Sequence, residues 1–138
     1  MAETLEFELV SPERLLVSQP AEMVVVPGSE GDFAAMARHA PLISAMRPGV
    51  IDVYEGGRVV QRIFVSGGFA EVNATRCTVL AEEAIPLGDL DGADIGERLR
   101  TAQAALDGAE SEHARNRARR GVAVAHAMQA ALEQRAAH

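Results

Sequence analysis

The stretch Val26-Pro27-Gly28-Ser29-Glu30-Gly31-Asp32-Phe33 decides the fold, together with Val65-Ser66-Gly67-Gly68-Phe69-Ala70-Glu71-Val72. In each stretch, β-branched and aromatic residues run into closely spaced glycines. Val and Phe favour strands, whereas Gly and Pro favour the sharp turns that end them. The first stretch therefore predicts a strand that ends at a tight turn, and the glycines of the second stretch predict a bulge or a close backbone approach within a strand.

The same punctuation extends over residues 4–87. Leu5, Phe7 and Leu9 alternate with glutamates, as expected for a half-buried strand. Glu55-Gly56-Gly57-Arg58 separates two apolar runs and predicts a hairpin turn. Many short strands with regular turn signals are typical of a sandwich or barrel. The predicted strands cover residues 5–9, 15–17, 21–26, 50–54 and 59–65, and a looser hairpin covers 71–80.

The hydrophobic period changes after Pro86-Leu87-Gly88. Spacings of three and four residues then predict two helices, the second from about Ala114 to Arg135. The first helix places Ile95, Leu99, Ala102, Leu106 and Ala109 on one face, and the second places Ala118, Val122, Ala125, Gln129 and Leu132 there. The predicted class is α+β: an N-terminal antiparallel β-sandwich (1–87), then a C-terminal antiparallel two-helix hairpin (88–138).

The two helices differ in charge. Residues 89–112 hold seven acids against two arginines, and residues 113–138 hold five arginines against one acid. The acidic and basic helices are expected to attract each other when they fold together. The seam between them is mainly alanine, which buries little apolar area. We therefore expect a mobile helical arm on a rigid β-domain.

The two glycine-containing stretches, with His39-Ala40-Pro41-Leu42-Ile43 and Arg47-Pro48-Gly49-Val50-Ile51, resemble the epsilon subunit of F-type proton-translocating ATP synthases. The resemblance implies a non-catalytic subunit of the central stalk, without a cofactor. Such a subunit links the gamma subunit to the c-ring and couples proton translocation to ATP synthesis. The implied location is peripheral, on the cytoplasmic face of the bacterial inner membrane.

The resemblance also implies contact residues. The turn at 28–33 and the nearby histidine imply a c-ring docking loop, whose members are Ser29, Glu30, Gly31, Asp32 and His39. The second glycine stretch implies a framework at the gamma contact, formed by Ser66, Gly67 and Gly68. The second helix implies an inhibitory basic segment that meets an acidic segment of the beta subunit, with Arg115, Arg117, Arg119 and Arg120. Guanidinium groups suit carboxylates because they present paired donors.

The sequence departs from the family in two places. The family usually reads Pro-Gly immediately before the histidine, where this chain has Ala37-Arg38. Some bacterial epsilon subunits carry an ATP-binding pattern, [Ile/Leu]-Asp-x-x-Arg-Ala, but here His113-Ala114 replaces its apolar residue and aspartate. A nucleotide site is therefore not supported, and Arg117 is the only charged residue that it would use.

Other functions find little support in the residues. A net charge of −7 opposes binding to nucleic acid, and no apolar run approaches the roughly 18 residues of a membrane span. The four histidines are scattered without companion ligands, so no metal site is predicted. Cys77 is expected to be a small buried strand residue. The alternatives are a β-sandwich adaptor with a helical partner, or a ligand-binding protein or hydrolase using Ser66, His39 and Asp52.

Overall fold

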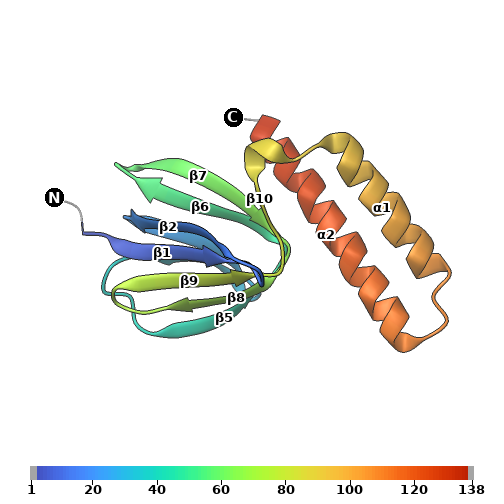
Figure 1. The fold of residues 1–138 in the computed structure, drawn as a ribbon, viewed down its shortest axis with the longest axis horizontal. Coiled ribbons are helices and arrows are strands. Elements are labelled where there is room, and N and C mark those ends of the chain that lie inside the picture. The colour runs from blue at the N-terminus through green and yellow to red at the C-terminus, as the bar shows by residue number, and fades with distance from the viewer. Residues whose placement is uncertain (1–2, 137–138) are drawn as a thin grey trace. The chain divides into compact units, whose positions relative to one another are not determined.

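The structure is a computed structural model that describes residues 3–136 and divides into two compact units. The β-unit ends at Pro86, and the helical unit begins at Leu87. Figure 1 shows the strands of the first unit and the two helices of the second.

The β-unit is built from strands that follow the predicted turns. The strands are β1 (Leu5–Val10), β2 (Leu15–Ala21), β3 (Met23–Gly28), β4 (Gly31–Ala35), β5 (Leu42–Met46), β6 (Gly49–Glu55), β7 (Arg58–Val65), β8 (Gly68–Val72), β9 (Arg76–Ala81) and β10 (Ala84–Pro86). Every predicted strand segment lies largely within one of them, and the 71–80 hairpin becomes the end of β8, a turn and β9. The strands β4, β5 and β10 lie outside the predicted segments.

These strands form one sheet in the order β10-β7-β6-β3-β5-β8-β9-β1-β2, with β4 paired to β3. The sheet curls on itself, as Figure 1 shows, and β5 joins β3 through the single pair Gly28 and Met46. The predicted sandwich is thus confirmed, with one difference. Strands β1 and β9 run parallel, since about 65 residues of chain connect them and no tight hairpin fixes their direction.

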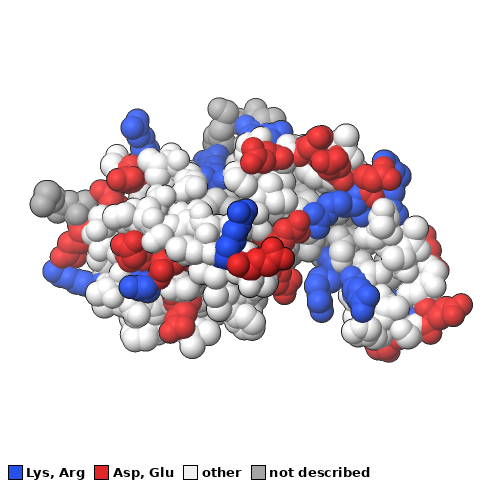
Figure 2. Space-filling model, in the orientation of Figure 1, with Lys and Arg blue, Asp and Glu red and all other residues white. Residues whose placement is uncertain are grey.

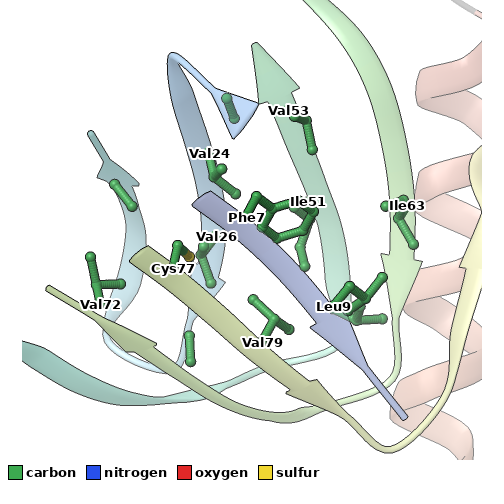
Figure 3. Close-up of a cluster of buried hydrophobic side chains, with 14 of the residues drawn as sticks. Phe7, Leu9, Val24, Val26, Ile51, Val53, Ile63, Val72, Cys77 and Val79 are labelled. Atoms are coloured by element: carbon green, nitrogen blue, oxygen red, sulfur yellow. The ribbon is translucent and has the colours of Figure 1, made fainter. Parts of the chain in front are cut away.

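The core lies between the two halves of the curled sheet. Figure 3 shows Phe7 of β1 among Val24 and Val26 of β3 and Ile51 of β6, with their side chains directed toward one another. All four are fully buried. The alternation predicted for residues 5–9 is confirmed, because Leu5, Phe7 and Leu9 point inward while the intervening glutamates are partly exposed.

Cys77 is fully buried in β9, as predicted. Burial raises the pKa of the Cys77 thiol to about 12, because an ionised thiolate would lose its hydration. The thiol therefore stays protonated at neutral pH and is a poor nucleophile in the folded chain.

The helical unit consists of a short 3-10 helix, η1 (Leu87–Asp89), and two helices, α1 (Gly92–Asp107) and α2 (Glu112–Ala136). The Asp91 side chain caps α1 by accepting a hydrogen bond from the backbone N–H of Ala93 at 2.9 Å. The Ser111 hydroxyl accepts one from the N–H of Ala114 at 3.0 Å near the start of α2. The predicted hairpin is confirmed.

Small residues form the seam between α1 and α2. A methyl group added to Gly121 of α2 would lie 3.3 Å from the Cβ atom of Ala102 in α1. Gly121 weakens α2 intrinsically by about 1 kcal/mol relative to alanine, but it allows the two helices to approach closely. Few large side chains are buried along this seam, so the packing between the helices is expected to be modest.

Candidate functional site: the exposed faces of the two units

An apolar row crosses the outer surface of the β-unit. Ala45, Phe69, Leu80, Val10 and Leu15 are paired in succession across β5, β8, β9, β1 and β2, so their side chains lie on one face. We call these five residues the apolar row. Phe69 is 57% exposed, and Leu80 and Leu15 are each 54% exposed. Contiguous apolar residues exposed on one face in this way are a candidate binding surface.

A polar row lies beside the apolar row on the same face. Glu71 pairs with Thr78, and Thr78 pairs with Glu8, two residues along each strand. Glu8 accepts a hydrogen bond from the Arg76 guanidinium. An apolar centre with a polar rim is the usual anatomy of a protein interface.

A hollow of about 380 Å³ adjoins the apolar row. Its lining includes Phe69 and Leu80 of the apolar row, together with Ser11, Pro12 and Glu82. The hollow is large enough to receive an apolar side chain from a partner.

The second glycine stretch holds this surface in place. Ser66 and Gly67 are buried. The Ser66 N–H donates to the carbonyl of Glu83, and the Gly67 carbonyl accepts from the N–H of Glu82, both at 3.0 Å. Gly68 begins β8 with φ +130°. The predicted gamma-contact framework is thus mostly enclosed by its own chain, and the adjacent Phe69 is the exposed residue.

The turn between β3 and β4 lies at the same end of the sheet. Gly28 pairs with Met46, and Met46 pairs with Gly68, so these residues lie side by side on three strands. Arg47 donates to the Gly28 carbonyl and to Asp32 Oδ1, each at 2.5 Å. Among the described residues, Glu30 has no ion-pair partner. Glu30 therefore carries the free charge of this turn.

His39 lies at the opposite end of the sheet. The preceding residue, Arg38, donates its backbone N–H to the Ala74 carbonyl at 2.7 Å, in the turn that follows β8. Ala74 comes six positions after Gly68, which corresponds to about 20 Å of extended strand. The structure therefore brings Ser29–Asp32 together with Ser66–Gly68 and leaves His39 apart. The predicted docking set does not form a single cluster.

Arg38 adopts a backbone conformation that glycine usually adopts. Its φ of 70° lies in the left-handed region, which glycine favours. The departure from Pro-Gly noted in the sequence therefore leaves the local backbone in a glycine-like conformation. An ion pair between Arg38 and Glu3 at 2.5 Å is largely exposed and adds little stability.

The structure does not assemble the alternative hydrolase site. Ser66 and His39 lie at opposite ends of β8, and Asp52 of β6 forms an ion pair with Arg62 of β7 at 3.4 Å. Among residues 3–136, no group of three or more His, Cys, Asp or Glu side chains could hold a metal ion, and His138 lies outside the described residues.

The four predicted arginines lie on α2, and none pairs with an acid of α1 within the described residues. Arg117 Nη2 lies 3.0 Å from His113 Nε2, and Arg119 donates weakly to Asn116 at 3.4 Å. Within α1, Glu97 and Arg100 form an ion pair. Figure 2 shows acidic and basic groups interspersed over the face in view, so charge recognition is expected to be local.

A groove of about 690 Å³ runs between α1 and α2. Its lining includes Asp94 and Glu97 as well as Arg98 and Arg117. Two carboxylates offset the two guanidinium groups, so the groove has no excess positive charge to attract a triphosphate. A nucleotide site resting on Arg117 therefore gains no support from these charges.

The comparisons with known proteins identify the family. Residues 4–87 match the model of the ATP synthase delta/epsilon chain β-sandwich domain. An ATP synthase epsilon chain of Rhodospirillum rubrum is 59% identical over 131 residues, covering 95% of this chain and 98% of the relative. This chain belongs to the ATP synthase epsilon family. An epsilon chain of Paramagnetospirillum magneticum is 56% identical, covering 96% of this chain and 99% of the relative.

A solved structure supports the family fold over both units. A chain in the Euglena gracilis mitochondrial ATP synthase, solved with OSCP, F1 and the c-ring, superimposes with a TM-score of 0.78 at 26% identity. The match covers 94% of this chain and 81% of that one. Membership of the epsilon family removes the alternative of an adaptor or ligand-binding protein unrelated to the synthase. Within residues 3–136, no helix is long and apolar enough to span a membrane.

Proposed function

We propose that this epsilon-family chain is a non-catalytic rotor subunit that links the gamma subunit to the c-ring and couples proton translocation to ATP synthesis. Its place would be peripheral, on the cytoplasmic face of the bacterial inner membrane, through the synthase complex. The related Euglena chain comes from an assembly that includes F1 and a c-ring. The proposal needs no cofactor and no active site in this chain.

The apolar row is the observation that carries this proposal. Phe69, Leu80 and Leu15 are more than half exposed. Contact of these apolar side chains with water is unfavourable, and a bound partner would remove it. Gamma is the partner that we assign, because the buried Ser66–Gly67 segment implied at the gamma contact positions Phe69 directly. The rigid sheet behind the row then transmits torque without deforming.

The turn at Ser29–Asp32 supplies the second contact of this proposal. Arg47 fixes the Asp32 carboxylate and the Gly28 carbonyl, so the turn is held in one shape. Glu30 projects a free carboxylate from it, suited to polar groups on the loops of the c-ring. The proposed c-ring contact therefore rests on Glu30 and the backbone of this turn. His39 lies at the other end of the sheet, so it is not part of the same contact.

The helical unit supplies a brake in this proposal. Arg115, Arg117, Arg119 and Arg120 have no carboxylate partner within the described part of α2 or α1. Unpaired guanidinium groups are available to an acidic segment of the beta subunit when α2 reaches it. Such a contact would oppose rotation in the direction of ATP hydrolysis.

Phe69→Asp tests the gamma contact. A charge placed in the apolar row would lose its hydration on binding, and central aromatic contacts typically contribute at least about 2 kcal/mol. We therefore expect affinity for epsilon-depleted F1 to fall by about 30-fold or more. Titration of that complex with full-length chain measures it.

Val60→Asp is the matched control, because Val60 is also exposed on a strand, at 45%, but lies outside the apolar row. The control should bind as the unaltered chain does. If the Phe69→Asp and Val60→Asp variants bind equally well, the apolar row is not part of the gamma contact.

A further inference from the structure

Arg135 connects the free end of the helical hairpin to its root. Its Nη1 atom donates to the backbone carbonyls of Leu87, Gly88 and Leu90, at 3.0, 3.2 and 2.9 Å. Arg135 lies in the last turn of α2, whereas the three carbonyls belong to η1 and the residue that follows it. The guanidinium therefore joins segments that are 45 to 48 residues apart in sequence.

The three carbonyls make Arg135 a strong contact for a surface arginine. The Leu87 carbonyl also accepts from the Leu90 N–H at 3.3 Å, and a cation is favoured near the carbonyls at the end of a helix. A hydrogen bond from an ionised donor is stronger than one between neutral groups. The contacts to Leu87 and Leu90 are partly buried, so water screens them less than it screens an exposed pair.

Apolar contacts along the hairpin accompany the Arg135 contact, and Ile95 of α1 and Met128 of α2 are buried. Near the same end, Leu132 of α2 approaches the backbone of Gly92, where an added methyl would lie 3.4 Å away. Further along, the seam narrows to Ala102 and Gly121. Because small residues bury little apolar area at that point of the seam, the multidentate polar contact of Arg135 adds to what the buried side chains contribute in holding α2 to the rest of the unit.

We propose that Arg135 is a latch that keeps α2 folded back on the root of the helical unit. This inference rests on the proposed function of the helices as a movable brake. Extension of α2 away from η1 and α1 must break all three hydrogen bonds. A carboxylate binds a guanidinium more strongly than a carbonyl does, so an acidic partner segment that captures Arg135 would stabilise the released state.

Arg135→Met tests the latch, because it removes every donor and keeps an unbranched apolar stem. Amide hydrogen exchange of the full-length chain is the readout, followed over residues 122–131, which lie away from the fraying end of α2. We expect exchange there to accelerate by about tenfold or more, with the β-unit unchanged. Gln134→Ala is the control, since Gln134 is exposed on the same turn.

Two measurements separate the latch from the brake. Faster exchange in Arg135→Met than in Gln134→Ala supports the latch, whether or not ATP hydrolysis by the reconstituted synthase changes. If exchange is faster and hydrolysis is unchanged, the latch stands and the brake is wrong. Equal exchange in the two variants overturns the latch.

Discussion

Replacing Gly68 with alanine is expected to destabilise the chain more than the same change at any other glycine. The added Cβ would lie 1.9 Å from the Leu80 carbonyl oxygen and 3.0 Å from its carbon. Both atoms are backbone within the paired strand β9, so no flexible side chain can move aside. The φ of +130° adds strain for any residue that carries a Cβ.

We expect Gly68→Ala to lower the free energy of unfolding by at least about 4 kcal/mol, a loss that is exceptional for a single substitution. That is a large share of the 5–15 kcal/mol of stability that is typical of folded domains. Denaturant unfolding of the full-length chain measures it. If the variant is unfolded or aggregated when it is expressed, the loss of stability is larger still.

Gly31→Ala separates the steric effect from the backbone strain. Gly31 has a φ of +133°, close to that of Gly68, but an added Cβ would meet no atom within 4 Å. We expect it to cost about 1–2 kcal/mol from the dihedral angle alone. Similar unfolding midpoints for the two variants would contradict the assignment of Gly68 to a close backbone approach.

Truncation after Leu87 is expected to raise ATP hydrolysis by the reconstituted synthase by about fivefold or more, if the brake contributes a typical regulatory free energy. The truncated chain keeps β10, whose pairing with β7 completes the β-unit. Its contacts with gamma and the c-ring should therefore persist. ATP-driven proton pumping, measured with hydrolysis, should show that coupling is retained.

A full-length variant with the four arginines changed to glutamine is the control for this truncation. It retains both helices but lacks the charges at 115, 117, 119 and 120, so hydrolysis should rise toward the truncated level. Unchanged hydrolysis in the truncated synthase would leave the chain as a structural coupler without a brake. Increased hydrolysis with loss of pumping would show that the helices contribute to coupling itself.

Local signals in the sequence predicted much of the fold. Gly56 and Gly57 both adopt positive φ, at 64° and 75°, as a two-residue hairpin turn requires. The change of period after Pro86 marked the start of the helical unit, and alternation identified the inward side of β1. These features depend on neighbours within a few residues, which a sequence displays directly.

Features that depend on distant pairing could not be predicted in this way. The parallel pairing of β1 with β9 brings Val10 beside Leu80, and this completes the apolar row. The sequence held a partial signal. Val79 and Leu80 are adjacent in one strand, so only one of them can face the core of the β-unit. Nothing local, however, indicated which strands would place their outward apolar residues next to one another.

The candidate sites were predicted unevenly for the same reason. Ser29–Asp32 are contiguous and stay together, whereas His39 separates from them because β4 carries the chain to the other end of the sheet. Asp32 could not be known to pair with Arg47, which follows a different strand. The Arg135 contact escaped prediction because its acceptors are backbone carbonyls, which carry no sequence signal.

If the apolar row faces gamma in the assembled rotor, site-specific photocrosslinking should join the two. A photoreactive phenylalanine analogue would replace Phe69, with the same group at Val60 as the control position, in the intact synthase. We expect a crosslink from position 69 to gamma and none to gamma from position 60. A crosslink from position 69 to the c-ring or to beta instead, with gamma unlabelled, would contradict it.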